Sequence, residues 1–122
     1  MNLQIETRMS DQLTRYLDLA TSQAKLTAAN MANIDTPGYR TVGMDFEAEM
    51  REAMDGVEQG KAPRQVRLKA VDGLIARPDG NNVSMDREGL SLAEAQLKFR
   101  TGVALLRQEY QHVMDAIHAD GK

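Results

Sequence analysis

The stretch "ANMANIDTPGYR", from Ala29 to Arg40, marks the place where a long first helix must end. Pro37 disfavours helical geometry at the residue before it, and a Pro-Gly pair suits the two central positions of a type II turn. The helix is therefore expected to stop near Ile34 or Asp35.

The last turns of this helix combine small side chains with amides. The side chains of Ala28, Ala29 and Ala32 leave little bulk, so a neighbouring helix could approach closely. Asn30 and Asn33 offer donors and acceptors that can satisfy a partner's backbone or fix the register of packing. A helix that merely stops at a turn explains the proline and glycine but not the paired asparagines.

Upstream of the stretch, apolar and small side chains recur every three or four residues, which is typical of one helix face. That face comprises Leu13, Leu17, Ala20, Ala24, Met31 and Ile34, with a gap at Thr27. Residues 1–35 are thus predicted to be an N-terminal helical segment, with the helix itself running from about residue 5 to residue 33.

Residues 83–122 show a stronger pattern, a heptad seam that predicts a second long helix. The seam comprises Met85, Leu92, Phe99, Val103, Leu106, Tyr110, Val113 and Ile117, and Leu90, Leu97 and Leu105 are expected to widen it. Ser84 is the expected N-cap, Asp86 and Glu88 place negative charge in the first turn, and Gly121 is a stop signal.

The connector, residues 36–82, has a different composition. The acidic segment Asp45–Gly56 is expected to form a short helix, and Gln65–Asn82 contains alternating apolar residues around an Asp-Gly pair, which indicates a β-hairpin. The acidic run Asp45–Glu58 and the basic run Lys61–Lys69 could attract one another between subunits.

These elements predict a mainly α fold. It is a single domain built from an antiparallel, coiled-coil-like pair of long N- and C-terminal amphipathic helices, joined by a small irregular or β connector. Each helix buries only one stripe in such a pair, so partners are expected to complete the burial.

Composition argues against several classes of function. The 122 residues carry a formal charge of −3, no cysteine and two histidines, so no catalytic residues, cofactor, metal site or small-molecule substrate are expected, and no nucleic acid. Glu109 and His112 form half of a di-iron E-x-x-H pattern without a second copy, and His118 lacks the spacing of a paired ligand. The sequence lacks the apolar run of a secretory signal, so export would need another route.

The motif around the turn resembles the N-terminal signature of the bacterial flagellar axial proteins of the rod and hook. The matching residues are Asn30, Ala32, Asn33, Thr36, Pro37, Gly38 and Tyr39. The segments "VGMDFEAEM" and "DGNNVSMDREGLSLAEAQLKFRTGVALL" are similar to those of the proximal rod, whereas residues 56–78 match nothing recognisable. Other rod proteins usually carry an Arg-Ala-Tyr run in the C-terminal helix, which is absent here.

This resemblance implies a non-enzymatic subunit of the proximal rod, whose terminal helices pack against neighbours in a hollow, torque-transmitting tube. The implied assembly motif is Ala29, Asn30, Ala32, Asn33, Thr36, Pro37, Gly38 and Tyr39. Implied partners are further copies of the chain, other rod proteins, inner-membrane ring and rod-adapter proteins at the rod base, and the flagellar type III export apparatus. The implied location is the periplasmic part of the basal body, reached without a cleaved signal peptide.

Two alternatives remain at this point, a small helical adaptor or export chaperone and a metal-binding bundle enzyme. A chaperone has no evident reason to carry the asparagine and Thr-Pro-Gly-Tyr signature.

Overall fold

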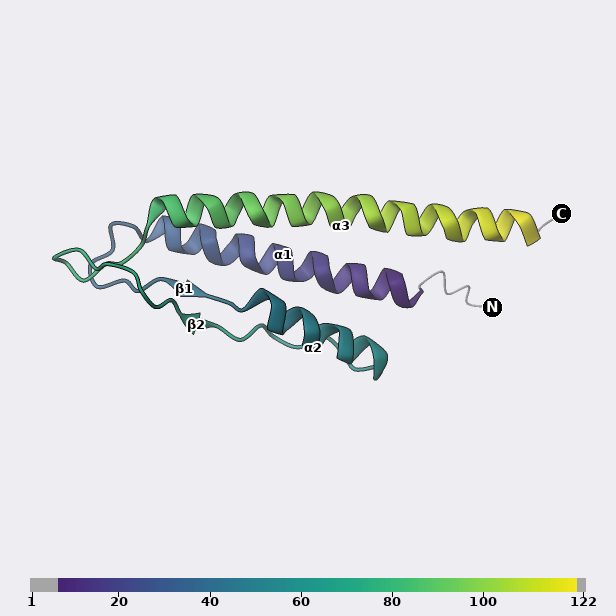
Figure 1. The fold of residues 1–122 in the computed structure, drawn as a ribbon, viewed down its shortest axis with the longest axis horizontal. Helices are drawn as coiled ribbons and strands as arrows, with labels where there is room; N and C mark the ends of the chain where they lie inside the picture. Colours follow the sequence, from purple (N-terminus) through teal and green to yellow (C-terminus); the bar gives the residue numbers. More distant parts are fainter. Residues whose placement is uncertain (1–6, 121–122) are drawn as a thin grey trace.

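Two long antiparallel helices lie side by side, and a shorter helix packs on the opposite side of the first one (Figure 1). The computed structural model describes residues 7–120. Its elements are α1 (Arg8–Ala32), β1 (Val42–Gly43), α2 (Phe46–Glu58), β2 (Lys69–Ala70) and α3 (Met85–Asp120). The mainly α fold with long terminal helices is therefore confirmed. None of the described helices is long and apolar enough to cross a membrane.

The first helix starts at a capping box. The Thr7 side chain accepts a hydrogen bond from the Ser10 N–H, and the Ser10 hydroxyl oxygen accepts one from the Thr7 N–H. These bonds satisfy two N–H groups that a helix start leaves free. The start expected near residue 5, and the rest of the segment before Thr7, lie outside the described residues.

The third helix starts as expected. The Ser84 hydroxyl accepts a hydrogen bond from the Arg87 N–H at 3.3 Å, and the Ser84 carbonyl accepts one from the Glu88 N–H at 2.9 Å. Asp86 and Glu88 lie in the first turn, near the positive end of the helix dipole. The stop signal at Gly121 lies outside the described residues.

The short acidic helix is also confirmed, as α2. Asp45 caps it by accepting a hydrogen bond from the Ala48 N–H at 3.1 Å. The Phe46 ring meets Tyr16 of α1 edge-on at 5.8 Å between centroids, and the Lys98 ammonium of α3 lies 3.7 Å from the same ring. All three helices thus meet around Phe46.

The predicted β-hairpin within residues 65–82 is wrong. β2 pairs antiparallel with β1, matching Ala70 with Val42 and Lys69 with Gly43. Gly73 does turn the chain, with φ of 80°, but the following residues enter a second turn that closes with a hydrogen bond from Gly80 to Arg77. The partner strand therefore comes from the segment after α1, a long-range contact that local alternation does not encode.

The core is small and unusually polar. Among the described residues the buried apolar side chains are Leu13, Leu19, Ala20, Val83 and Ala95, whereas the buried polar ones are Ser10, Gln23, Thr27, Asn30, Thr41, Glu49, Asn81, Asn82 and Glu88. Apolar burial is thus modest, and hydrogen bonds set much of the arrangement.

Candidate assembly surface

The turn after α1 has the predicted geometry. The Tyr39 N–H donates to the Thr36 carbonyl at 3.1 Å, and Gly38 adopts φ of 76°, the left-handed value that the third residue of a type II turn requires. Pro37 and Gly38 are exposed at this corner. The turn therefore projects from the end of the helix pair and directs the chain back toward β1.

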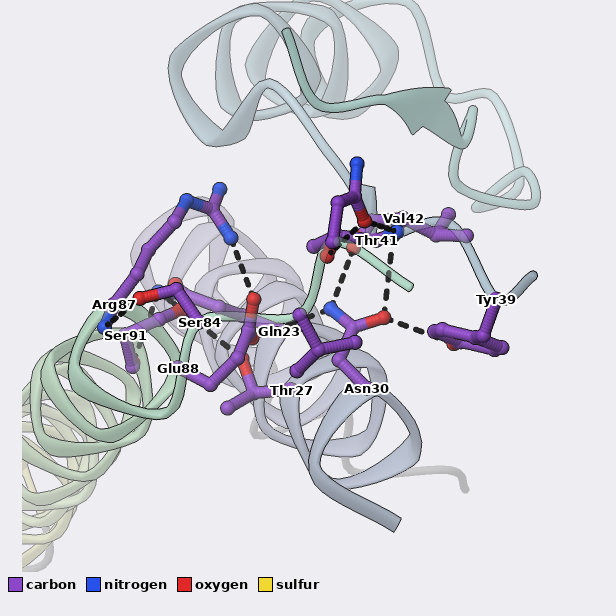
Figure 2. A network of polar contacts seen from close by, with 12 residues as sticks. Gln23, Thr27, Asn30, Tyr39, Thr41, Val42, Ser84, Arg87, Glu88 and Ser91 are labelled. Atoms are coloured by element: carbon purple, nitrogen blue, oxygen red, sulfur yellow. Dashed lines mark hydrogen bonds and ion pairs between the residues drawn. The ribbon is translucent and has the colours of Figure 1, made fainter. Parts of the chain in front are cut away.

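Asn30 joins this corner to both long helices (Figure 2). Its side chain is 1% exposed; the amide nitrogen donates to the Val42 carbonyl at 2.8 Å and to the Glu88 carboxylate at 3.2 Å. Its amide oxygen accepts from the Tyr39 hydroxyl at 2.9 Å and from the Val42 N–H at 3.2 Å. The Asn30 amide thus satisfies backbone groups of its own chain and not those of a neighbouring subunit. It fixes the register of packing within the chain.

Glu88 completes that junction from α3. Its carboxylate is 1% exposed and accepts a hydrogen bond from Arg87 at 2.6 Å in addition to the one from Asn30. A buried carboxylate is costly unless it is paired and hydrogen-bonded, and here it has both kinds of partner. The pairing ties the start of α3 to the last turns of α1.

A second pair of asparagines, not identified from the sequence beyond their turn chemistry, holds the same corner. Asn81, fully buried, donates to the carbonyls of Asn33 and Thr36 at 2.8 and 2.9 Å. Asn82 accepts from the N–H of Thr41 at 2.6 Å and from its hydroxyl at 2.9 Å. In the sequence, the signal at these positions is the Asp-Gly-Asn-Asn run Asp79–Asn82, whose residue types favour a turn but do not indicate its partner.

Polar side chains continue along the contact between α1 and α3. Gln23 donates to the Ser91 carbonyl and hydroxyl at 3.2 Å each, and Thr27 shares a 3.0 Å hydrogen bond with the same hydroxyl. Lys98 donates to the Gln23 amide oxygen at 2.9 Å. The apparent gap at Thr27 in the predicted apolar face is therefore a contact position, 3% exposed.

The buried residues of α3 are Glu88, Ala95 and Gly102, spaced seven apart along the side that faces α1. The predicted seam lies beside them. Leu92, Phe99 and Leu106 each follow a buried position by four residues, which places them about 40° further around the helix. The helix pair thus uses a small and polar ridge, and the apolar seam flanks it, because small residues allow the closer approach.

The seam is consequently only part buried. On α1, Leu13 and Ala20 are buried, whereas Leu17, Ala24, Met31 and Ile34 are half-buried. On α3, the half-buried residues are Leu92, Val103, Leu106 and Val113, and the exposed ones are Met85, Phe99, Tyr110 and Ile117.

Leu90 and Leu97 do not widen the seam, contrary to expectation. They are 63% and 67% exposed and lie on the side of α3 away from α1. Leu105 is also exposed, at 45%.

The amides and the small residues of the motif have separate roles in the fold. Ala29, Ala32, Thr36, Pro37 and Gly38 are exposed, whereas Asn33, which donates to the Ala29 carbonyl at 2.8 Å, and Tyr39 are half-buried. The buried amides therefore build the corner, and the small residues stay on its surface.

Comparison with known proteins identifies the family to which this chain belongs. No model of a known protein family matches the chain. The flagellar basal body rod protein FlgB of Salmonella typhimurium is 35% identical over 119 residues, which cover 83% of this chain and 86% of that protein. The chain belongs to the FlgB family of flagellar rod proteins.

Other FlgB proteins are more distant but equally extensive in coverage. FlgB of Yersinia ruckeri is 29% identical over 83% of this chain and 87% of its own length. FlgB of Escherichia coli is 24% identical over 84% and 88%. The similarity therefore extends along the helices and the connector of this FlgB-family chain.

The charged runs of this FlgB-family chain meet within one molecule. Arg64 pairs with Glu49 at 3.1 Å and with Glu52, and Arg67 pairs with the same two carboxylates at 3.2 and 2.7 Å. The hydrogen bond from Arg64, together with the nearby cations, holds the pKa of Glu52 below its usual range. The same hydrogen bond and the carboxylates of Glu49 and Glu52 raise the pKa of Arg64. The acidic and basic runs thus bind residues 64–67 to α2, and their expected attraction occurs inside the subunit.

Proposed function

We propose that this chain is a non-enzymatic structural subunit of the proximal rod of the flagellar basal body, where its terminal helices pack against neighbours in a hollow tube that transmits torque. The observation that carries the proposal is the 35% identity to a basal body rod protein over more than four fifths of both chains. An adaptor or export chaperone is not favoured, because the relatives are rod proteins.

Two exposed features support packing through the terminal helices. The first is the small-residue surface at the end of α1, which includes Ala29 and Ala32 and allows close approach of a neighbouring helix. The second is the exposed part of the α3 seam, where Phe99 is 44% exposed and Tyr110 and Ile117 are each 42% exposed. Large apolar side chains repeated along a helix commonly mark a surface that a partner covers.

The partners in this proposal are further copies of the chain, other rod proteins, and the inner-membrane ring and rod-adapter proteins at the rod base. The subunit would reach the periplasmic rod through the flagellar type III export apparatus without cleavage of a signal peptide. In a strain whose export apparatus is disabled but whose Sec pathway works, the protein should stay in the cytoplasm. Its recovery from the periplasm of that strain would contradict the route.

The function itself is tested by deletion and location. Cells lacking this chain should be non-motile and should contain basal bodies without a complete rod, and a plasmid-borne copy should restore both. Basal bodies purified from wild-type cells should still contain the chain after they have been washed. Rods of normal appearance in the deletion strain would contradict the proposal.

A further inference from the structure

The Asp-Gly pair Asp72–Gly73 does not close a hairpin, because β2 ends at Ala70 and pairs with β1 (Figure 1). Asp-Gly pairs share a reactivity, since glycine has no side chain to shield its main-chain nitrogen from the preceding carboxyl group. That nitrogen can attack the carboxyl carbon and close a succinimide ring. The chain contains four such pairs, Asp55–Gly56, Asp72–Gly73, Asp79–Gly80 and Asp120–Gly121. Gly121 lies outside the described residues, so the structure bears on the first three.

The first pair is held inside a helix. Asp55 and Gly56 lie within α2, where main-chain N–H groups donate to carbonyls four residues earlier. Gly56 is buried, and its carbonyl accepts a hydrogen bond from the Lys61 N–H at 2.8 Å. Attack by the Gly56 nitrogen therefore requires the end of α2 to open first.

The pair Asp79–Gly80 is held by hydrogen bonds at both reacting groups. The Gly80 N–H donates to the Arg77 carbonyl at 2.8 Å, and the Asp79 carboxylate accepts from the Asn81 N–H at 3.0 Å. The pair also packs on the corner after α1, since the Asp79 carbonyl accepts a hydrogen bond from the Gly38 N–H at 2.8 Å. Ring closure at Asp79 therefore also requires local opening.

The pair Asp72–Gly73 lacks these restraints. Both residues are exposed, and a Cβ atom at Gly73 would have nothing within 4 Å. Within residues 7–120, no main-chain carbonyl accepts a hydrogen bond from the Gly73 N–H. The last main-chain bond before the pair runs from the Val71 N–H to the Thr41 carbonyl at 3.2 Å. The Gly73 nitrogen can thus reach the Asp72 carboxyl group while the rest of the fold stays closed.

We propose that Asp72 is a site of spontaneous isomerisation to isoaspartate in the folded chain. The Gly73 nitrogen attacks Cγ of the protonated Asp72 carboxyl group, a C–N bond forms, and the hydroxyl group leaves with the N–H proton as water. A water molecule then adds to the main-chain carbonyl carbon of Asp72 and breaks its bond to the Gly73 nitrogen. The main chain now runs through Cβ and Cγ of Asp72, and a free carboxyl group remains on Cα. One water leaves and one enters, so the composition of the chain is unchanged.

The product lengthens the main chain by one carbon atom just after β2. The neighbouring Val71 is bonded to the carbonyl of Thr41, and the fully buried Thr41 hydroxyl donates to Asn82 at 2.9 Å. The change therefore falls beside the hydrogen bonds that hold the corner. The new carboxyl group on Cα is the chemical group that protein isoaspartyl methyltransferases methylate. The inference does not depend on the proposed rod function.

The purified full-length protein, kept at neutral pH over weeks, tests the ranking of the pairs. Electron-transfer mass spectrometry of its peptides locates isoaspartate at each position. Isoaspartate should form at Asp72 about tenfold faster or more than at Asp55 and Asp79, because those two pairs react only from a locally open state. In guanidinium chloride, which unfolds the chain, the three rates should become similar.

Asp72→Glu is the matched control, since the longer side chain would have to close a less favourable six-membered ring. The position is exposed, so the circular dichroism of the variant should equal that of the wild type. After the same incubation, an isoaspartyl methyltransferase with labelled S-adenosylmethionine should label the peptide that spans residue 72 in the wild type and not in the variant.

Several results would overturn the inference, and none of them bears on the rod function. These are no isoaspartate at Asp72, an equal rate at Asp79 in the folded protein, or a label on this peptide that persists in Asp72→Glu. A lead of Asp72 that stays the same in the unfolded chain would also overturn it, because the cause would then be the local sequence and not the fold.

Discussion

A Cβ atom at Gly102 of α3 would lie 2.6 Å from Cδ2 of Leu17 on α1. Cδ1 of Tyr16 is also close, at 3.0 Å from the same point. The missing side chain thus sets how closely the two long helices approach, in line with the buried ridge that Gly102 shares with Ala95 and Glu88.

This contact predicts opposite effects for two glycines of the same helix. Gly89 has nothing within 4 Å of its virtual Cβ, so Gly89→Ala should raise the free energy of unfolding by about 1 kcal/mol through helix propensity alone. Gly102→Ala gains the same propensity but must displace Leu17, and overpacking costs about 1–3 kcal/mol. Urea unfolding followed by circular dichroism should therefore rank Gly89→Ala above Gly102→Ala. Equal stabilities would contradict the close approach.

The Asn30 junction predicts an unequal effect of the two signature asparagines. Asn30→Ala leaves Val42 and Glu88 without their partner in a buried site, and each unpaired buried group costs about 1–3 kcal/mol, so a loss of about 3 kcal/mol is expected. Asn33 is only half-buried and bonds locally, so Asn33→Ala should cost about 1 kcal/mol. We expect unfolding to remain one cooperative transition in both variants, as the proposed single-domain organisation requires. A larger loss for Asn33→Ala would refute this account of the junction.

The charge cluster on α2 predicts a dependence on acid pH. Because the pKa of Glu52 is lower in the folded chain than its ordinary value, the carboxylate favours the folded connector above that value. The contribution is lost as the pH falls through the lowered pKa. NMR titration should show the Glu52 carboxyl titrating below about pH 4.3, the usual glutamate value, and Arg64→Gln should bring it back toward that value. An unchanged titration in Arg64→Gln would show that Arg64 is not the cause.

The sequence predicted the elements that local chemistry determines. The long helices followed from apolar spacing, the start of α3 from Ser84, and the corner from Pro37 and Gly38. Each of these signals lies within a few residues of the structure that it specifies, so no knowledge of distant contacts was needed.

The long-range contacts could not be predicted in the same way. β1 and β2 have two residues each and pair across the whole of α2, and Asn81 binds carbonyls at the end of α1, 45 and 48 residues away. On α3 the contact was misplaced because the heptad pattern weights apolar residues, whereas Glu88, Ala95 and Gly102 form the buried ridge. On α1 the predicted face includes the buried Leu13 and Ala20, and the polar Gln23 and Thr27 are buried as well. Which of two neighbouring faces of α3 is covered depends on the helix that packs against it. The apolar seam stays partly exposed and remains available to a partner subunit.

The most direct test of the central claim, assembly of a rod through the exposed face at the end of α1, is the motility of an Ala32→Leu strain. Ala32 is exposed, so the variant should fold like the wild type by circular dichroism and be exported, whereas Leu should overpack a close helix contact by about 1–3 kcal/mol at every subunit. Ala62→Leu, at an exposed connector position, is the control. We expect soluble subunit, no rod and no swimming in the Ala32→Leu strain only. Normal swimming of that strain would mean that this face meets solvent and would contradict the account.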